Sequence, residues 1–291
     1  LKDAASGLEA EPAEAGRASK GAAWGLYAKS LLFQKKYAEA ETAIKNLEGL
    51  GLYSLEGNFE DLFKSGAENS SECIFAIRYG NTTDASLGNN LNVWFAPSKD
   101  GGYYFNAPNE SLVACYDETT LGGEDDPRLD ATVGRDGKPW FDGTTFSKNW
   151  SEATGYLVKK YNEDVVEGQA RAQCTIPQHI LRYADVLLMK AEVLNEQGQT
   201  ENAEAALNQV RTRAKLELKR SLSQDKLREA IRVERRRELA FEFHRFGDIM
   251  RYGKDYAHEA LGSDIKWEGE RFYFPIPQAE IDANKALNTK N

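Results

Sequence analysis

The amino-acid sequence predicts a mainly α fold, an α/α superhelix of paired helices that carries a long irregular, loop-rich insertion. Apolar residues recur at three- and four-residue steps within residues 17–50 and 178–253, as they do along the buried face of a helix. Alanines occupy the close-packing positions in both regions, so neighbouring helix backbones are expected to approach closely. Residues 81–157 lack this periodicity and are punctuated by Gly, Asn, Asp and Pro, which favour turns.

The first region predicts a helical hairpin. One helix is expected from about Ser19 to Gln34, and a second helix with a single apolar stripe should follow it. The stripe comprises Tyr37, Ala40, Ala43, Ile44 and Leu47. A short strand or buried run is expected further on, from Ile74 to Ile77.

The second region predicts another hairpin. Gly198 should end its first helix, because glycine tolerates the left-handed conformation of a helix C-terminus. Thr200 is the expected N-cap of the next helix. The buried face of the first helix is predicted to be Ile180, Ala184, Leu187, Ala191 and Leu194. The stripe of the second is predicted to be Ala203, Ala206, Leu207, Val210 and Ala214.

Helix pairs with alanine at their contacts are typical of tetratricopeptide-like helical repeats, whose units stack because none buries its own face alone. Stable stacking needs at least about three units, and only two are evident here. Either the helix expected after Leu222 supplies a further unit, or part of the array lies outside this chain. Residues 1–291 are interpreted as a single domain, because no Pro/Ser-rich linker divides them.

Four blocks of the sequence resemble the SusD/RagB family, in that family's order. Residues 16–40 resemble its central helical hairpin, and the other three blocks resemble its C-terminal portion. Those three are LRYADVLLMKAEVLNEQG with ALNQVRTRA, then LREAIRVERRRELAFEFHRFGDIMRYG, then FYFPIPQAEIDANKAL. The resemblance implies a cell-surface, lipid-anchored protein of a Bacteroidetes-type outer membrane. It also implies capture of oligosaccharides for a SusC-like TonB-dependent transporter, without catalysis.

Two alternatives to this function remain open. One is a peptide-binding member of the same family, and the other is a helical-repeat scaffold without a small-molecule site. Family members begin with a lipoprotein signal, an acylated cysteine and a long helical portion. Because the chain starts at Leu1 without a signal sequence, we expect it to be the C-terminal part of a longer protein. Since no apolar run approaches about 20 residues, membrane attachment is expected only through that N-terminal lipid or a partner.

The net charge of −9 disfavours a nucleic-acid partner, which would require a concentrated basic face. The one basic cluster is interleaved with glutamates, so a solvated or internally paired helix face is expected there. Its basic members are Arg232, Arg235, Arg236 and Arg237. Charges at three- and four-residue steps predict an ion-pair ladder along that helix, formed by Arg235, Glu238, Glu242 and Arg245.

No catalytic or cofactor motif stands out. The chain has three histidines and lacks HExxH, GxSxG and P-loop motifs, and His244 is interpreted as structural. Three widely spaced cysteines, Cys73, Cys115 and Cys174, have no zinc-site spacing and are interpreted mainly as buried thiols. The acidic turn Glu124–Asp130 has the ligands for a hard cation such as calcium but lacks calcium-loop spacing, so a solvated turn is favoured over a metal site.

Aromatic residues are concentrated in the insertion, where helical periodicity does not explain them. A pyranose ring has an apolar C–H face that packs on an aromatic ring, while its hydroxyls need hydrogen-bonding groups. We therefore predict a carbohydrate site formed by Trp94, Tyr103, Tyr104 and Phe105, with Asn92 as a polar contact. The Gly101–Gly102 pair is expected to give this loop freedom to present the rings. The alternative is a small core beneath the insertion, which is favoured for Trp140 and Trp150.

Overall fold

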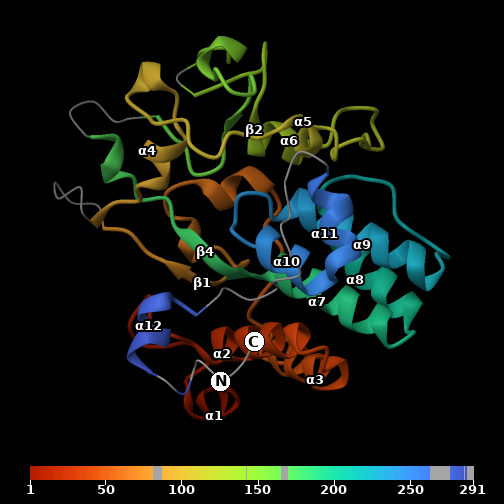
Figure 1. The fold of residues 1–291 in the computed structure, drawn as a ribbon. Coiled ribbons are helices and arrows are strands. Elements are labelled where there is room, and N and C mark those ends of the chain that lie inside the picture. The colour runs from red at the N-terminus through yellow and green to blue at the C-terminus, as the bar shows by residue number, and fades with distance from the viewer. Residues whose placement is uncertain (81–86, 142, 165–169, 263–275, 285, 287–291) are drawn as a thin grey trace. The chain divides into compact units, whose positions relative to one another are not determined.

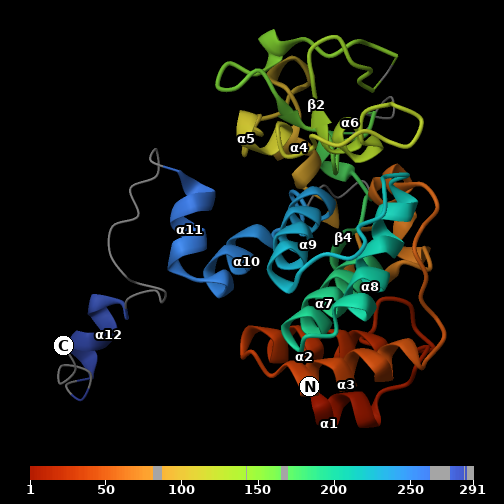
Figure 2. The same cartoon turned by 90° about the vertical axis from the view of Figure 1, so that its right-hand side faces the viewer.

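The computed structural model describes residues 1–80, 87–141, 143–164, 170–262, 276–284 and 286. The chain divides into two compact units, Leu1–Phe243 and His244–Asn291. Helices dominate both, so the mainly α prediction with tetratricopeptide-like packing is confirmed (Figures 1 and 2). None of the described helices is both long enough and apolar enough to span a membrane.

The α-helices of the first unit are α1 (Lys2–Gly7), α2 (Lys20–Phe33), α3 (Tyr37–Glu48), α4 (Leu91–Phe95), α5 (Glu110–Val113), α6 (Pro127–Thr132), α7 (Tyr183–Glu196), α8 (Thr200–Arg213) and α9 (Gln224–Glu238). Its strands are β1 (Cys73–Ile77), β2 (Val133–Gly134), β3 (Leu157–Val158) and β4 (Gln178–Arg182). Short 3₁₀ helices include η1 (Phe59–Phe63) and η6 (Arg171–Gln173).

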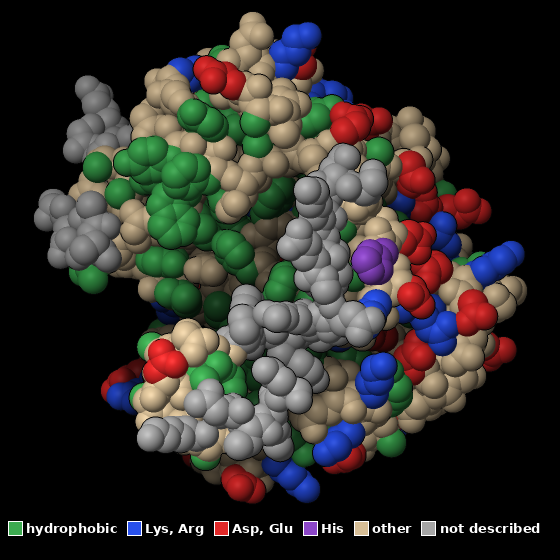
Figure 3. Space-filling model, in the orientation of Figure 1, with side chains coloured by type: hydrophobic (Ala, Val, Ile, Leu, Met, Phe, Trp, Pro, Cys, Tyr) green, Lys and Arg blue, Asp and Glu red, His purple; other side chains and the backbone are tan. Residues whose placement is uncertain are grey.

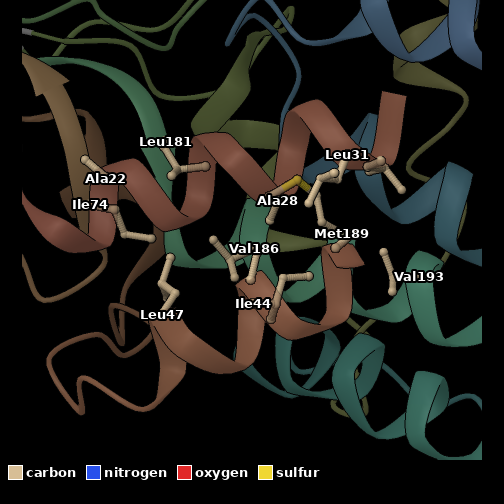
Figure 4. Close-up of a cluster of buried hydrophobic side chains, with 13 residues drawn as sticks. Ala22, Ala28, Leu31, Ile44, Leu47, Ile74, Leu181, Val186, Met189 and Val193 are labelled. Carbon is tan, nitrogen blue, oxygen red and sulfur yellow. The ribbon is translucent and has the colours of Figure 1, made fainter. Parts of the chain in front are cut away.

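Helices α2 and α3 pack as an antiparallel hairpin against α7. Ser19 caps α2, since its hydroxyl accepts a hydrogen bond from the Ala22 amide at 3.1 Å. Gly25 of α2 lies so close to Leu181 that a Cβ there would stand 2.2 Å from the leucine Cδ2. Figure 4 shows the resulting core, where side chains from α2 and α3 meet those of α7 and the two long strands.

Helix α7 is the centre of the helical array, because it packs against α2, α3, α8 and α9. Eleven of its fourteen residues are buried, whereas the sequence predicted one buried face. Ile180 was wrongly assigned to this helix and lies in β4 instead. Gly198 ends the helix region with φ of +76°, as predicted. Thr200 is the first residue of α8 rather than its N-cap, which is Gln199.

The predicted apolar stripe of α8 is buried against α7 from Ala203 to Val210, whereas Ala214, also buried, lies just after the helix. The helix expected after Leu222 is α9, and it packs on both α7 and α8. A third helical layer is therefore present within this chain. It packs on the second hairpin, whose first helix, α7, also packs on α2 and α3, so each unit has a neighbour.

Strands β1 and β4 form an antiparallel pair, in which Cys73 lies opposite Arg182 and Ile77 lies opposite Gln178. This confirms the short strand expected from Ile74 to Ile77. Strands β2 and β3 form a second, shorter antiparallel pair. In the first unit the insertion lies on one side of β4, and α2 and α3 lie on the other (Figures 1 and 2).

The insertion contains short helices and strands and has small cores of its own. Trp140 is 7% exposed and packs with Phe146, Leu157 and the partly buried Trp150. The ring centroids of Trp140 and Trp150 are 6.2 Å apart in an edge arrangement. The small core predicted for these two tryptophans is therefore confirmed.

A buried ion-pair network joins the helical array to the insertion. Arg182 contacts Glu72 and Glu238 at 2.6 Å and Glu242 at 2.7 Å, and all four side chains are at most 1% exposed. Arg128 of α6 contacts Glu238 at 3.0 Å and also Asp126 and Glu234. We name these residues the ionic core: Glu72, Asp126, Arg128, Lys160, Arg182, Arg213, Glu234, Glu238 and Glu242.

The predicted ion-pair ladder along one helix is wrong. Helix α9 ends at Glu238, and the partners of Glu238 and Glu242 come from distant segments. Arg235 instead contacts Asp185 of α7 at 2.9 Å. Of the two alternatives for the basic cluster, a solvated face is wrong for Arg235 and Arg237, each 2% exposed, and internal pairing holds, since Arg237 contacts Glu118 at 2.6 Å.

The second unit contains α10 (Arg245–Tyr252), α11 (Lys254–Leu261) and α12 (Gln278–Ala283). His244 occupies the N-cap position of α10, and Arg245 donates a hydrogen bond to the Tyr256 hydroxyl at 3.0 Å. Pro277 precedes α12 as its N-cap.

Candidate ligand-binding site

Four exposed aromatic side chains occupy α4 and the segment that follows it. Trp94 is 45% exposed, Tyr104 is 39% exposed, and Tyr103 and Phe105 are each 54% exposed. We name these four residues the aromatic platform. Figure 3 shows hydrophobic side chains gathered on the surface around α4. Contiguous exposed apolar surface on a protein commonly marks an interaction site.

The backbone beneath the platform is fixed by hydrogen bonds. The amides of Tyr103 and Phe105 donate to the carbonyls of Val93 and Trp94 at 2.9 and 2.7 Å. The amide of Tyr104 donates to the Ala96 carbonyl at 3.0 Å. These bonds satisfy carbonyls that the C-terminus of a helix otherwise leaves free. The segment 103–105 is therefore held along the end of α4.

Gly101 and Gly102 allow a tight turn and do not make the loop flexible, although the sequence had led us to expect flexibility. Gly101 has φ of +76°, and a Cβ on Gly102 would lie 2.2 Å from the Ala96 carbonyl oxygen. Both positions therefore require glycine so that the turn can close tightly. Tyr104 also has a positive φ, of 46°, which is uncommon for a residue with a side chain and is typical of constrained functional loops.

The platform rings have a defined arrangement. Tyr103 and Phe105 are stacked, with ring centroids 5.4 Å apart and an interplanar angle of 19°. They flank Tyr104, whose left-handed backbone conformation turns the chain between them. This stacking orders two large rings at the surface in advance of any ligand.

Asn92 does not belong to the exposed site, which corrects the sequence interpretation. It is 1% exposed, and its side-chain oxygen accepts a hydrogen bond from Arg171 Nη1 at 2.8 Å. Arg171 Nε also donates to the Asp100 carbonyl at 3.1 Å. Asn92 and Arg171 therefore hold the platform loop from behind. Arg171 was not identified from sequence, because it lies 79 residues from Asn92.

Two other asparagines beside the platform are accessible. Asn90 and Asn106 are exposed, and neither side chain hydrogen-bonds to a described residue. Asn109 is occupied, since its side chain caps α5 through the Leu112 amide at 3.0 Å. The amides of Asn90 and Asn106 can donate to and accept from sugar hydroxyls next to the rings.

The comparisons with known proteins agree with this architecture. The SusD family model matches residues 71–291. The chain belongs to the SusD family. SusD-like protein P2 of Formosa agariphila is 27% identical, over 89% of this chain and 55% of its own length. This SusD-family chain thus spans about half the length of the curated relatives it matches.

Solved structures of SusD-like proteins have the same fold as this chain. A SusD-like carbohydrate binding protein from Bacteroides fragilis matches with a TM-score of 0.78 and 30% identity, over 89% of this chain and 57% of its own. A laminarin binding SusD-like protein matches with a TM-score of 0.77 and 27% identity. That match covers 98% of this chain and 65% of the other.

Titratable groups elsewhere in this SusD-family chain are engaged in structural contacts. Burial raises the pKa of the Cys73 thiol to about 11 and also raises that of Cys174. Burial lowers the pKa of His179, whose Nε2 lies 2.8 Å from the Leu62 carbonyl oxygen. A thiol with a raised pKa is a poor nucleophile at neutral pH.

The acidic turn is also occupied by protein groups. Asp126 is buried and contacts Arg128 at 2.6 Å, so the expectation of a wholly solvated turn is wrong for it. Asp125 and Asp130 contact Arg135 at 3.0 and 2.6 Å. Among the described residues, no group of three or more His, Cys, Asp or Glu is placed to hold a metal ion.

Proposed function

We propose that this chain is the oligosaccharide-binding part of a cell-surface protein, and that the aromatic platform contacts the sugar. The observation that carries the proposal is the exposure of four rings on a loop whose backbone is fixed. Sugar rings stack on such faces through their apolar C–H bonds, and Asn90 and Asn106 supply hydrogen bonds to hydroxyls. Membership of the SusD family and the laminarin-binding relative support this ligand class.

The wider role that we propose is nutrient capture at the outer membrane. The protein is attached by an N-terminal lipid and passes the bound oligosaccharide to a SusC-like TonB-dependent transporter, without chemical change. Family membership supports this role. Co-purification of the full-length protein with such a transporter from outer membranes tests it. Recovery of the full-length protein without any transporter would contradict it.

Affinity gel electrophoresis with soluble polysaccharides tests the site. Laminarin is the first polysaccharide to include, because a relative is named for binding it. We expect the parent to be retarded by at least one polysaccharide of the panel. Trp94→Ala and Tyr104→Ala should each weaken binding by about threefold to tenfold, the worth of one stacked ring. The double variant Trp94→Ala/Tyr103→Ala should abolish retardation.

Phe33→Ala is the matched control. Phe33 is 46% exposed, close to the value for Trp94, but it lies at the end of α2. Its removal should leave retardation unchanged. Retardation that survives the double variant would place the sugar elsewhere. Binding of peptides but no glycan would favour the peptide alternative, and release of reducing ends would indicate hydrolysis.

A further inference from the structure

A cavity of about 640 Å³ lies in the first unit and shares no residue with the aromatic platform. Its walls come from the start of η1, from α6, from the hairpin around Trp140 and from the end of α8. Small-molecule sites commonly have volumes of about 300–1,000 Å³. The cavity is therefore large enough for a sugar-sized ring together with a substituent.

One wall holds a lysine whose charge is incompletely matched. The Lys159 side chain is only 11% exposed, and its nearest described carboxylate oxygen, Glu60 Oε1, is 3.7 Å away. That separation is too long for a hydrogen bond. No described acceptor lies within hydrogen-bonding distance of its Nζ. Buried ammonium groups normally have such acceptors, so this one is available to an incoming anion.

A second lysine adds to the positive charge. Lys215 follows α8, lines the same cavity and is exposed, and it forms no ion pair with a described residue. The carboxylate of Asp130, on another wall, is already paired with Arg135 at 2.6 Å. Besides Asp130, the cavity thus has two ammonium groups and one carboxylate, that of Glu60, which lies 3.7 Å from Lys159 Nζ.

The remaining arginines of the cavity form ion pairs within the ionic core, and Arg213 Nε has no hydrogen-bond partner among the described residues. Arg213 contacts Glu72 at 3.4 Å and also contacts Glu238, while Arg128 is fully buried among carboxylates. Their positive charge next to the cavity is balanced by the protein itself.

The cavity also has an aromatic wall. Trp140 and Phe141 line it, with ring centroids 5.0 Å apart in an edge arrangement. The Lys159 Nζ lies 5.6 Å from the centroid of Phe141. An aromatic surface next to two ammonium groups suits a ligand with an apolar ring face and an anionic substituent.

We propose that this cavity is a second ligand site, which binds a sugar-sized ring carrying a carboxylate or a sulfate ester. The anionic group lies between Lys159 and Lys215, and the ring packs on Phe141 and Trp140. Lys159 and Lys160, which follow strand β3, then have different partners. Lys159 faces the ligand, while Lys160 contacts Glu242 at 2.9 Å inside the ionic core. The site does not depend on the platform.

Titration of the chain with D-glucuronate, D-glucose 6-sulfate and D-glucose, followed by tryptophan fluorescence or NMR, tests this proposal. We expect saturable binding of glucuronate, of the sulfate ester or of both, and none of neutral glucose. Binding of both anions shows that charge alone is recognised, and binding of one identifies the preferred group. Raising the salt from about 0.01 M to about 0.15 M should weaken binding by screening.

Lys159→Met and Lys215→Met should each weaken anion binding by about tenfold. Lys138→Met is the matched control. Lys138 lies in the hairpin around Trp140, its side chain is 41% exposed, and it does not line the cavity. This variant should change the affinity less than about twofold, within the effect of a surface charge. Lys215 is exposed, so its variant should fold even if Lys159→Met does not.

Trp94→Ala should leave anion binding intact, which separates this site from the platform. The proposal is overturned if folded parent protein binds neither anion. Equal binding of glucose would also overturn it, as would an equal loss of affinity in Lys138→Met.

Discussion

Charged side chains are usually exposed and aromatic side chains are usually buried, but the ionic core and the aromatic platform show the opposite arrangement. Arg182 is 1% exposed and Glu238 is fully buried, whereas Tyr103 and Phe105 are each more than half exposed. Removing charges from water is unfavourable unless partners surround them, so the ionic core forms only when distant segments meet correctly. Exposed rings gain nothing from water, so their value lies in contacts with another molecule. One region specifies the fold and the other is available for binding.

The largest expected effect comes from breaking the ionic core. Arg182→Met removes a cation shared by Glu72, Glu238 and Glu242 and leaves the buried cluster with an excess of negative charge, which Arg128, Lys160 and Arg213 only partly balance. We expect the free energy of unfolding to fall by about 3–5 kcal/mol, measured by urea denaturation.

The control for this change is Arg228→Met. Arg228 contacts Glu196 at 2.5 Å, but its side chain is 25% exposed. The expected loss is no more than about 1 kcal/mol. Similar losses in the two variants would mean that the ionic core has no special place in the fold.

Lys160 gives the ionic core a measurable pH dependence. Burial lowers the pKa of Lys160 to about 8, although Glu242 opposes the shift. Between that value and the unfolded value of 10.5, the unfolded chain holds a proton that the folded chain has lost. The free energy of unfolding should therefore rise with pH above 8, by no more than about 3 kcal/mol.

Lys160→Met removes the titrating amine and should remove this rise. Urea denaturation of parent and variant at several pH values from about 8 to 9.5, below the usual titration of tyrosine, makes the comparison. Parallel curves for parent and variant would show that Lys160 stays protonated in the folded chain.

Local patterns allowed much of the helical array to be predicted. The stripe from Ala40 to Leu47 repeats with helical spacing, and Gly198 ends its helix for a reason local to the backbone. Helix α7 was harder to predict, because its second buried face depends on helices far away in the sequence. Ile180 has helical spacing relative to Ala184 but pairs in β4 with β1, about a hundred residues earlier.

The candidate site shows the same limit. The concentration of rings around Trp94 is visible in the sequence, and their exposure follows the predicted pattern. The sequence did not show that Asn90 is exposed while Asn92 is buried, because the burial of Asn92 depends on its contact with Arg171. Likewise Glu238 and Arg235 have the spacing of a helical ladder, yet Glu238 pairs with Arg182, 56 residues away in the sequence, and Arg235 pairs with Asp185, 50 residues away. Spacing predicts neighbours along a helix, not the tertiary partners that outcompete them.

Gly102→Ala sharpens the comparison by disturbing the platform without touching its rings. The new Cβ would lie 2.2 Å from the backbone oxygen of Ala96, so the turn must shift. We expect about 1–3 kcal/mol of destabilisation, the usual cost of overpacking, together with loss of polysaccharide retardation. The control is Gly122→Ala, whose Cβ would meet only the Thr120 hydroxyl oxygen at 3.7 Å. Unchanged binding in Gly102→Ala would show that the loop adapts and that its rigidity is unimportant.

The smallest expected effect on stability comes from removing a platform ring. Tyr103→Ala removes a ring that is 54% exposed and stacked on Phe105, so the loss should be at most about 1 kcal/mol. Polysaccharide retardation should nevertheless weaken, because the ring acts on the ligand. Thermal denaturation and affinity electrophoresis of the same preparation separate the two quantities. A loss of stability as large as that of Arg182→Met would mean that the ring supports the fold, and the contrast between the two regions would fail.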